Sequence, residues 1–230
     1  MPVTGNHDSI YDTAGDTEIY KHFNIQVPIE NNVLRYGIFY SYDYANAHFI
    51  VLNTDCFKSS GGALDDVQLN WLKSDLENNQ QEWTIVVLHR PLFAIRQIEE
   101  SANKSQLLSL FNEAGVDLVI QSHEHVYMRS YPINENESIL SDSPIRTEND
   151  IDYFVNPEGV LFITCATAGL DGKPPIETVS KDFCHTYGDG HASSWGDFTI
   201  DNNKLTVSVK YYDEGIKEYE NGTWGIIKEP

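Results

Sequence analysis

Three short motifs place histidine, asparagine and aspartate where they could bind metal ions and transfer protons. His89 directly follows the apolar run 84–88, and His123 and His125 follow the apolar run 116–120 after a short polar break. In open α/β sheets ligands gather beyond the carboxyl ends of the strands, so we expect these histidines to meet at one edge. Imidazole nitrogen is a common ligand of Zn, Fe and Mn. Taken alone, each histidine is more often a hydrogen-bonded structural residue than a metal ligand.

The third motif is Gly5-Asn6-His7-Asp8, near the start of the chain. Residues 2–4 could end a strand, and a glycine allows the tight turn that would follow it. Asn6 offers a neutral carbonyl oxygen to a metal ion, and His7 could donate a proton or hydrogen-bond a phosphoryl oxygen. Asp8 could orient His7. The simpler interpretation is a turn without chemistry.

Apolar and helical patterns predict the elements that must position these motifs. The runs 84–88, 116–120 and 160–165 are continuous and apolar, as expected for strands buried on both faces. Residues 64–79 and 104–115 carry leucines at helical spacing, and each precedes one of the first two strands. This order of helix, strand, helix, strand predicts a layered α/β domain.

Local signals refine the boundaries of these elements. Asp65 and Gln68 form a plausible capping box for the first helix, and Gly115 stands where the second helix should stop. Alternating aromatic and polar residues over 33–54 predict a hairpin or meander, and 195–215 predict a second hairpin. Residues 133–158 are polar and acidic, and they predict a long surface loop.

Composition excludes several classes of protein. The chain has 230 residues, 15 Lys+Arg and 35 Asp+Glu, so its formal charge is −20, which argues against binding a nucleic-acid backbone. Its aromatic content of 12% excludes a disordered acidic tail.

No apolar run approaches the roughly 20 residues of a membrane span, and no signal peptide is visible. The three cysteines are too few for a disulfide framework, although one bridge stays open. No linker divides the chain, so we expect one domain over residues 1–230.

The motifs GNHD at 5–8, VVLHRP at 86–91 and SHEHVYMRSYP at 122–132 occur in the order and rough spacing of the calcineurin-like metallophosphoesterases. Within that family the chain resembles the purple acid phosphatase branch over essentially its whole length. The resemblance implies an α/β (α+β) fold with two sheets sandwiched between helices, here lacking the first strand–helix units and so incomplete at the N-terminus. It also implies hydrolysis of small phosphate-ester substrates, in which a hydroxide activated by two metal ions (Fe, Zn or Mn) attacks phosphorus.

Carried onto matching positions, the resemblance assigns Asn6, His89 and His123 to the second metal and His125 to the first. It implies that His7 steadies the transition state or protonates the leaving group, with Asp8 beside it. The family's earlier motifs, which supply the first metal's carboxylate and the bridging aspartate, would lie before Met1. This chain therefore carries a partial ligand set, and we expect weak or partial metal binding. The resemblance suggests a secreted or extracytoplasmic location, and it leaves the oligomeric state unknown.

Several alternatives stay open at this stage. The chain could be a catalytically inactive fragment or pseudoenzyme that acts as a binding module, or a phosphodiesterase or nucleotidase of the same family. Arg90 could bind phosphate or be structural. Ser122 stands where the family usually has glycine before its histidine pair. His185 and His191 flank a glycine-rich stretch that could be a substrate-side loop, with a surface turn as the simpler interpretation.

Overall fold

The computed structural model describes residues 2–8, 23, 29–30, 33–34, 39–55, 63–96, 103–169, 172–177 and 179–229. Its internal contacts separate the chain into two compact units. The first unit contains Met1–Ala94 and Glu99–His123, and the second contains Ile95–Ile98 and Glu124–Pro230. The single domain expected over residues 1–230 stays a prediction.

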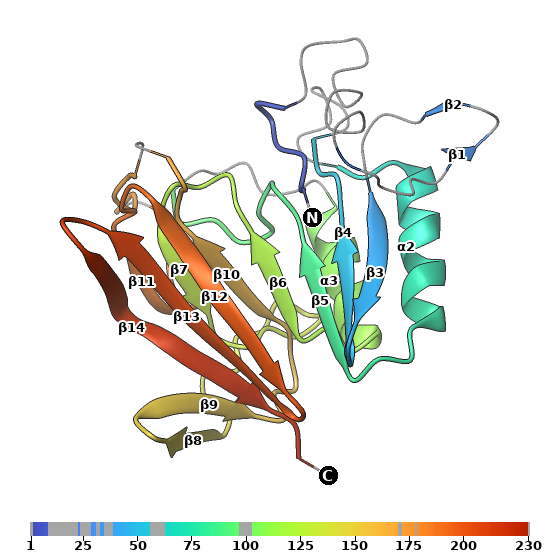
Figure 1. Ribbon diagram of the computed structural model, residues 1–230. Coiled ribbons are helices and arrows are strands. Elements are labelled where there is room, and N and C mark those ends of the chain that lie inside the picture. The colour runs from blue at the N-terminus through green and yellow to red at the C-terminus, as the bar shows by residue number, and fades with distance from the viewer. Residues whose placement is uncertain are drawn as a thin grey trace. The chain divides into compact units, whose positions relative to one another are not determined.

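The first unit is built on four neighbouring strands, of which the first two form an antiparallel hairpin and the last three run parallel to one another (Figure 1). In sheet order these strands are β3 (Tyr40–Tyr44), β4 (Ala47–Val51), β5 (Trp83–Val87) and β6 (Leu118–Gln121). Two short strands, β1 (Ile29–Glu30) and β2 (Val33–Leu34), pair separately. The strands predicted at 84–88 and 116–120 are therefore confirmed within two residues, and the hairpin predicted inside 33–54 is β3–β4.

Both predicted helices are present in the first unit, as α2 (Asp66–Asn78) and α3 (Lys104–Glu113). In α2 the stripe Leu69, Leu72 and Leu76 is buried, which holds the helix against the unit's core. Helix α3 ends just before Gly115, whose φ of 67° is the left-handed conformation typical of a helix stop. Neither of these helices is long and apolar enough to cross a bilayer.

The predicted capping box of α2 forms only in half. The Asp65 carboxylate accepts a hydrogen bond from the Gln68 backbone N–H at 2.8 Å, as an N-cap should. The Gln68 side chain, however, does not reach back to Asp65. It is buried, and it pairs with the backbone N–H and C=O of Asn53 at 2.8 and 3.0 Å. Gln68 therefore satisfies the chain just beyond β4 rather than the helix terminus.

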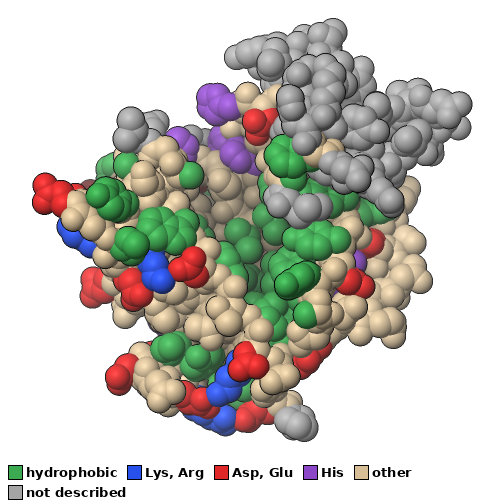
Figure 2. All heavy atoms as spheres, in the orientation of Figure 1, with side chains coloured by type: hydrophobic (Ala, Val, Ile, Leu, Met, Phe, Trp, Pro, Cys, Tyr) green, Lys and Arg blue, Asp and Glu red, His purple; other side chains and the backbone are tan. Residues whose placement is uncertain are grey.

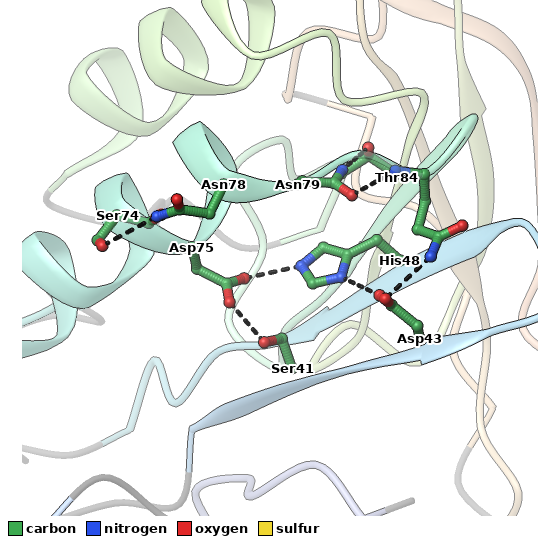
Figure 3. A network of polar contacts seen from close by, with 9 residues as sticks. Ser41, Asp43, His48, Ser74, Asp75, Asn78, Asn79 and Thr84 are labelled. Carbon is green, nitrogen blue, oxygen red and sulfur yellow. Dashed lines mark hydrogen bonds and ion pairs between the residues drawn. The ribbon is translucent and has the colours of Figure 1, made fainter.

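A buried histidine ties α2 to the β3–β4 hairpin (Figure 3). His48 Nδ1 lies 2.6 Å from an Asp43 oxygen, and His48 Nε2 lies 2.8 Å from an Asp75 oxygen. The second Asp75 oxygen accepts a hydrogen bond from the Ser41 hydroxyl at 2.6 Å. Burial alone would lower the pKa of His48, but the hydrogen bonds to Asp75 and Asp43 outweigh burial and raise it. His48 is therefore a structural link between the helix and the sheet, and its two carboxylate partners favour the charged form of the ring.

The second unit holds two groups of paired strands, which are antiparallel except for one parallel pair (Figure 1). In the first of them β7 (Tyr127–Ser130) pairs with both β10 (Leu161–Cys165) and β11 (Cys184–Gly188). The other has the order β12 (Ser194–Asp201), β13 (Lys204–Tyr212), β14 (Ile216–Ile227), β9 (Ile151–Val155) and β8 (Ile145–Glu148). The strand predicted at 160–165 and the hairpin predicted at 195–215 are confirmed.

The long surface loop predicted at 133–158 is wrong over its second half. Strands β8 and β9 form a hairpin there, and β9 pairs in parallel with the distant β14. Tyr153 and Phe154 of β9 are buried against that neighbour. The segment is a strand because of a partner that lies about 70 residues later in the chain, and local polarity conceals this.

An arginine lies in the core of the second unit. Arg129 of β7 is 2% exposed, and its guanidinium carbon lies 4.8 Å from the centre of the Trp224 ring. Its Nη2 donates to His185 Nδ1 at 2.6 Å, which requires a neutral imidazole. Burial, together with the nearby Arg129 charge, lowers the pKa of His185 to about 4. His185 therefore pairs with a core arginine and lies half-buried in β11 rather than in a surface turn.

The candidate metal centre

Three side chains from separate segments of the first unit converge on one point. Asn6 Oδ1 lies 2.8 Å from His89 Nε2 and 3.3 Å from His123 Nδ1, and the two histidine nitrogens are 3.1 Å apart. The imidazole rings meet edge to face, with centroids 5.1 Å apart. We call Asn6, His89 and His123 the Asn-His-His triad.

The parallel strands β5 and β6 bring the two histidines together. His89 lies two residues beyond β5 and His123 two residues beyond β6. Hydrogen bonds continue past the strand ends, from Leu88 N–H to the Ile120 carbonyl at 3.0 Å and from Ser122 N–H to the His89 carbonyl at 3.1 Å. The carboxyl ends of adjacent parallel strands share one edge of a sheet, and both side chains project from it.

A tight turn carries Asn6 to the same edge. Asp8 N–H donates to the Gly5 carbonyl at 3.0 Å, and Gly5 N–H donates to Asp8 Oδ2 at 2.9 Å. The segment before the turn is anchored by the Tyr40 hydroxyl, which donates to the Pro2 carbonyl at 2.7 Å. The Asp8 carboxylate thus closes the turn that presents Asn6.

Gly5 is required because a larger side chain would collide with His89, and not because of its backbone conformation. A Cβ atom at this position would lie 2.9 Å from both Cε1 and Nδ1 of His89, closer than real Cβ contacts. The imidazole therefore lies directly against the glycine backbone. The sequence alone indicates a glycine at a turn, but not that this glycine sets the position of His89.

The backbone of the last motif is strained at the histidine itself. His123 has a φ of 68°, in the left-handed region that non-glycine residues seldom adopt. Ser122 is not among the described residues with positive φ. A serine is therefore tolerated where the resembling family usually has glycine, because the unusual conformation falls on the next residue.

His7 and Asp8, the predicted catalytic pair, both have exposed side chains next to Asn6. Asp8 is hydrogen-bonded to Gly5 through both its N–H and its carboxylate, so its carboxylate is engaged in the turn. Exposure leaves His7 accessible to a substrate. Catalytic roles for the two residues stay predictions.

Arg90, next to His89, is held by a buried carboxylate. Its Nε donates to Asp55 Oδ1 at 2.6 Å, and its backbone N–H donates to the Thr54 hydroxyl at 2.7 Å. Burial raises the pKa of Asp55 despite the opposing hydrogen bond from Arg90. Asp55 Oδ2 is also buried and has no hydrogen-bond partner in the described part of the chain. The pair fixes the Arg90 side chain, and the sequence did not reveal this partner.

His125 belongs to the second unit, where it lies in a crowded turn. Its carbonyl accepts a hydrogen bond from Lys173 N–H at 2.8 Å. A Cβ atom on Gly190 would approach that carbonyl oxygen to 1.7 Å, so the glycine backbone lies directly against it. The assignment of His125 to a first metal stays a prediction.

The triad's donor set fits a transition-metal ion. Donor atoms about 2.1 Å from one ion and at right angles to each other lie about 3 Å apart, close to the separations within the triad. Imidazole nitrogen and amide oxygen suit Zn, Mn or Fe(II). All three donors are neutral, and in the described ranges no three His, Cys, Asp or Glu side chains gather as a metal-binding group. The site could therefore hold an ion without neutralising it.

The free thiols fit no part of this site. Cys165 and Cys184 are unbonded, and burial raises the pKa of each to about 12. Thiolates are the metal-binding form of cysteine, so neither residue is prepared to act as a ligand. Cys56 lies outside the described residues, and no bridge joins Cys165 to Cys184.

Comparisons with known proteins identify a family for the chain. A sequence model of the calcineurin-like phosphoesterases matches residues 1–127. Acid phosphatase type 7 of Homo sapiens is 28% identical over 193 residues, covering 75% of this chain and 40% of that protein. Purple acid phosphatase 21 of Arabidopsis thaliana is 28% identical over 204 residues, covering 83% of this chain and 42% of that protein.

A solved structure shows the same fold. Purple acid phosphatase PPD1 from yellow lupin (Lupinus luteus) superposes with a TM-score of 0.66 at 16% identity, over 99% of this chain and 40% of the lupin chain. This match confirms the predicted mixed α/β fold. The chain spans about two fifths of the length of the relatives it matches.

Proposed function

The chain belongs to the calcineurin-like phosphoesterase family, and from this we propose that it takes part in metal-dependent hydrolysis of phosphate monoesters. One observation carries the proposal. Three donor atoms from segments more than 30 residues apart in sequence lie within 3.3 Å of one another at the carboxyl edge of a parallel sheet. A bound metal ion would account for that convergence of donor atoms.

Asn6, His89 and His123 would hold the family's second metal ion, and His125 would contribute to the first. A bound metal ion supplies positive charge that polarises a phosphoryl oxygen and lowers the pKa of water. Because the triad is neutral, that positive charge would stay available to an anionic substrate. This matters in a chain of formal charge −20, in which the protein itself offers a phosphate little attraction.

The chain's own residues would orient the ester and move a proton. His7 is exposed one residue from Asn6, so it could donate a proton to the leaving oxygen of a substrate held at the triad. Arg90 is fixed next to His89 by Asp55, and its charge would add to the attraction of the phosphate. Gly5 and Asp8 keep Asn6 in place through the turn.

Turnover of p-nitrophenyl phosphate, measured with Zn²⁺, Mn²⁺ or Fe²⁺ against a chelated control, tests this function. We expect metal-dependent hydrolysis that falls by at least about 100-fold in His89→Ala and His123→Ala, because each removes an ion ligand. His48→Gln is the matched control, since His48 is the structural link between α2 and the β3–β4 hairpin. Equal turnover with and without metal would refute the proposal. A comparison with bis-p-nitrophenyl phosphate separates a monoesterase from a diesterase.

The absence of a carboxylate from the triad supports a second candidate, a binding module without catalysis. Carboxylates compensate the repulsion between two closely spaced cations, and the described residues bring none to the triad. Such a module would bind metal and phosphate yet release no product. Detectable metal-dependent turnover by the 230-residue chain excludes it. A secreted or extracytoplasmic location is a further proposal that rests on family membership alone.

A further inference from the structure

Glu124, between the two histidines of the last motif, is buried and bonded through both oxygens. It is 1% exposed, and its Oε2 accepts a hydrogen bond from Ile95 N–H while its Oε1 accepts one from Arg96 N–H, both at 2.6 Å. Short hydrogen bonds to an ionised carboxylate are among the strong ones in proteins. One side chain thus fixes two consecutive peptide groups that lie 28 and 29 positions earlier in the chain.

The peptide groups that Glu124 holds bind a second loop. The Ile95 carbonyl accepts a hydrogen bond from Ile176 N–H at 3.2 Å. Arg96 Nη1 donates to the Pro174 carbonyl at 2.6 Å. Residues 95–96 therefore hold residues 174–176, while their own N–H groups are bonded to the Glu124 carboxylate.

The second loop returns to the histidine motif and closes a ring. Lys173 N–H donates to the His125 carbonyl at 2.8 Å, and Gly190 N–H donates to the Lys173 carbonyl at 2.7 Å. The path runs from the Glu124 carboxylate through residues 95–96 and 173–176 to the His125 backbone, one peptide bond from where it began. We call this path the Glu124 ring, and all of it lies within the second unit.

We propose that Glu124 is a positioning residue, which sets the place and orientation of His125 as a cation ligand by closing the Glu124 ring. The inference rests on the proposed metal-binding function. Glu124 does not need to touch substrate or metal. Its carboxylate replaces water as the acceptor for two buried peptide groups, and the ring transmits that constraint to the His125 backbone.

Amide hydrogen exchange tests the ring without any metal. In the unaltered chain the amides of Ile95, Arg96, Lys173 and Ile176 should be protected. Glu124→Gln replaces one accepting oxygen with an amide nitrogen that cannot accept, so exchange at these four amides should accelerate by about 10- to 100-fold. The amide of Ile133, bonded to Val160 elsewhere in the unit, is the internal control. Unprotected Lys173 and Ile176 amides in the unaltered chain would overturn the ring, even if Glu124→Gln failed to fold.

A double-mutant cycle on Zn²⁺ affinity, measured by calorimetry, tests the route through His125. We expect Glu124→Gln and His125→Ala each to weaken, by about tenfold or more, binding of the further Zn²⁺ equivalent beyond the ion at the triad, and the double variant to bind that equivalent no more weakly than His125→Ala alone. Glu77→Gln, exposed on α2, removes the same charge and should leave affinity unchanged. Additive losses, or a loss in Glu124→Gln when His125→Ala has none, would overturn the proposal. If the unaltered chain binds no Zn²⁺, the proposed function fails, and the exchange rates alone decide the positioning role.

Discussion

Gly5→Ala should disable the triad while leaving the fold intact. The added Cβ would lie 2.9 Å from Cε1 and Nδ1 and 3.1 Å from Cγ of His89, whereas ordinary contacts begin near 3.4 Å. The ring must therefore move by about 0.5 Å, since its neighbour is the turn backbone. A metal site tolerates about that displacement before it loses function. Gly5 is not among the described glycines with positive φ, so alanine introduces no backbone strain there.

We expect this displacement to weaken Zn²⁺ binding by about 10- to 100-fold, the range for changes just outside a metal's ligands. Isothermal calorimetry gives the affinity, and thermal unfolding without metal checks that the fold persists. Gly188→Ala is the matched control, because a Cβ there would have no atom within 4 Å. Gly5→Ala with unchanged affinity and unchanged melting temperature would refute the steric argument and the position of His89 on which it depends.

Three further predictions concern stability. The pKa of His185 is about 4 when folded and 6.5 when free, so between these pH values the unfolded chain binds more protons than the folded chain. The contribution of His185 to the free energy of unfolding should therefore be complete above pH 6.5 and fall by at most about 3 kcal/mol as the pH drops to 4. In urea unfolding, His185→Gln should lack most of this pH dependence. The pKa of His48 is raised on folding, so its pH dependence has the opposite sign: its stabilisation is present at low pH and is lost as the pH rises through the folded pKa. His48→Gln should therefore destabilise the chain more at pH 5 than at pH 9. Gln68→Met should destabilise by about 2–4 kcal/mol in the same assay, because it leaves the buried N–H and C=O of Asn53 without partners, and a change below about 0.5 kcal/mol would contradict this.

The elements that position the triad were predictable because local patterns specify them. Continuous apolar runs indicate β5 and β6, and a histidine placed just after each run points to the shared edge of a parallel sheet. Asn6 was found from its motif. Its approach to within 2.8 Å of His89 depends on contacts between residues 83 positions apart, for which no local pattern exists.

The remaining features depend on tertiary partners. Gln68 looks like half of a capping box, yet its side chain is captured by Asn53, because a buried backbone donor and acceptor need partners more than an exposed helix end does. Strand β9 forms against β14, about 70 residues away. Arg129 sits in the core because rings and a neutral imidazole surround it, whereas charged residues are ordinarily predicted at the surface.

The distribution of surface charge, unlike the local sequence patterns, does not indicate where the candidate site lies. Figure 2 shows acidic side chains spread over the visible face rather than gathered at one site, with several histidines near one end. The net charge of −20 therefore sets the general character of the surface. Attraction of a phosphate has to arise locally, at the triad and Arg90.

Zn²⁺ calorimetry on the unaltered chain and on single alanine variants tests the central claim most directly. We predict one ion bound at the triad, with affinity lowered at least about tenfold in each of Asn6→Ala, His89→Ala and His123→Ala. His7→Ala should bind as tightly as the unaltered chain, since His7 lies beside the triad but outside it. An unaltered chain that binds no ion, or triad variants that bind as tightly as His7→Ala, would contradict the account.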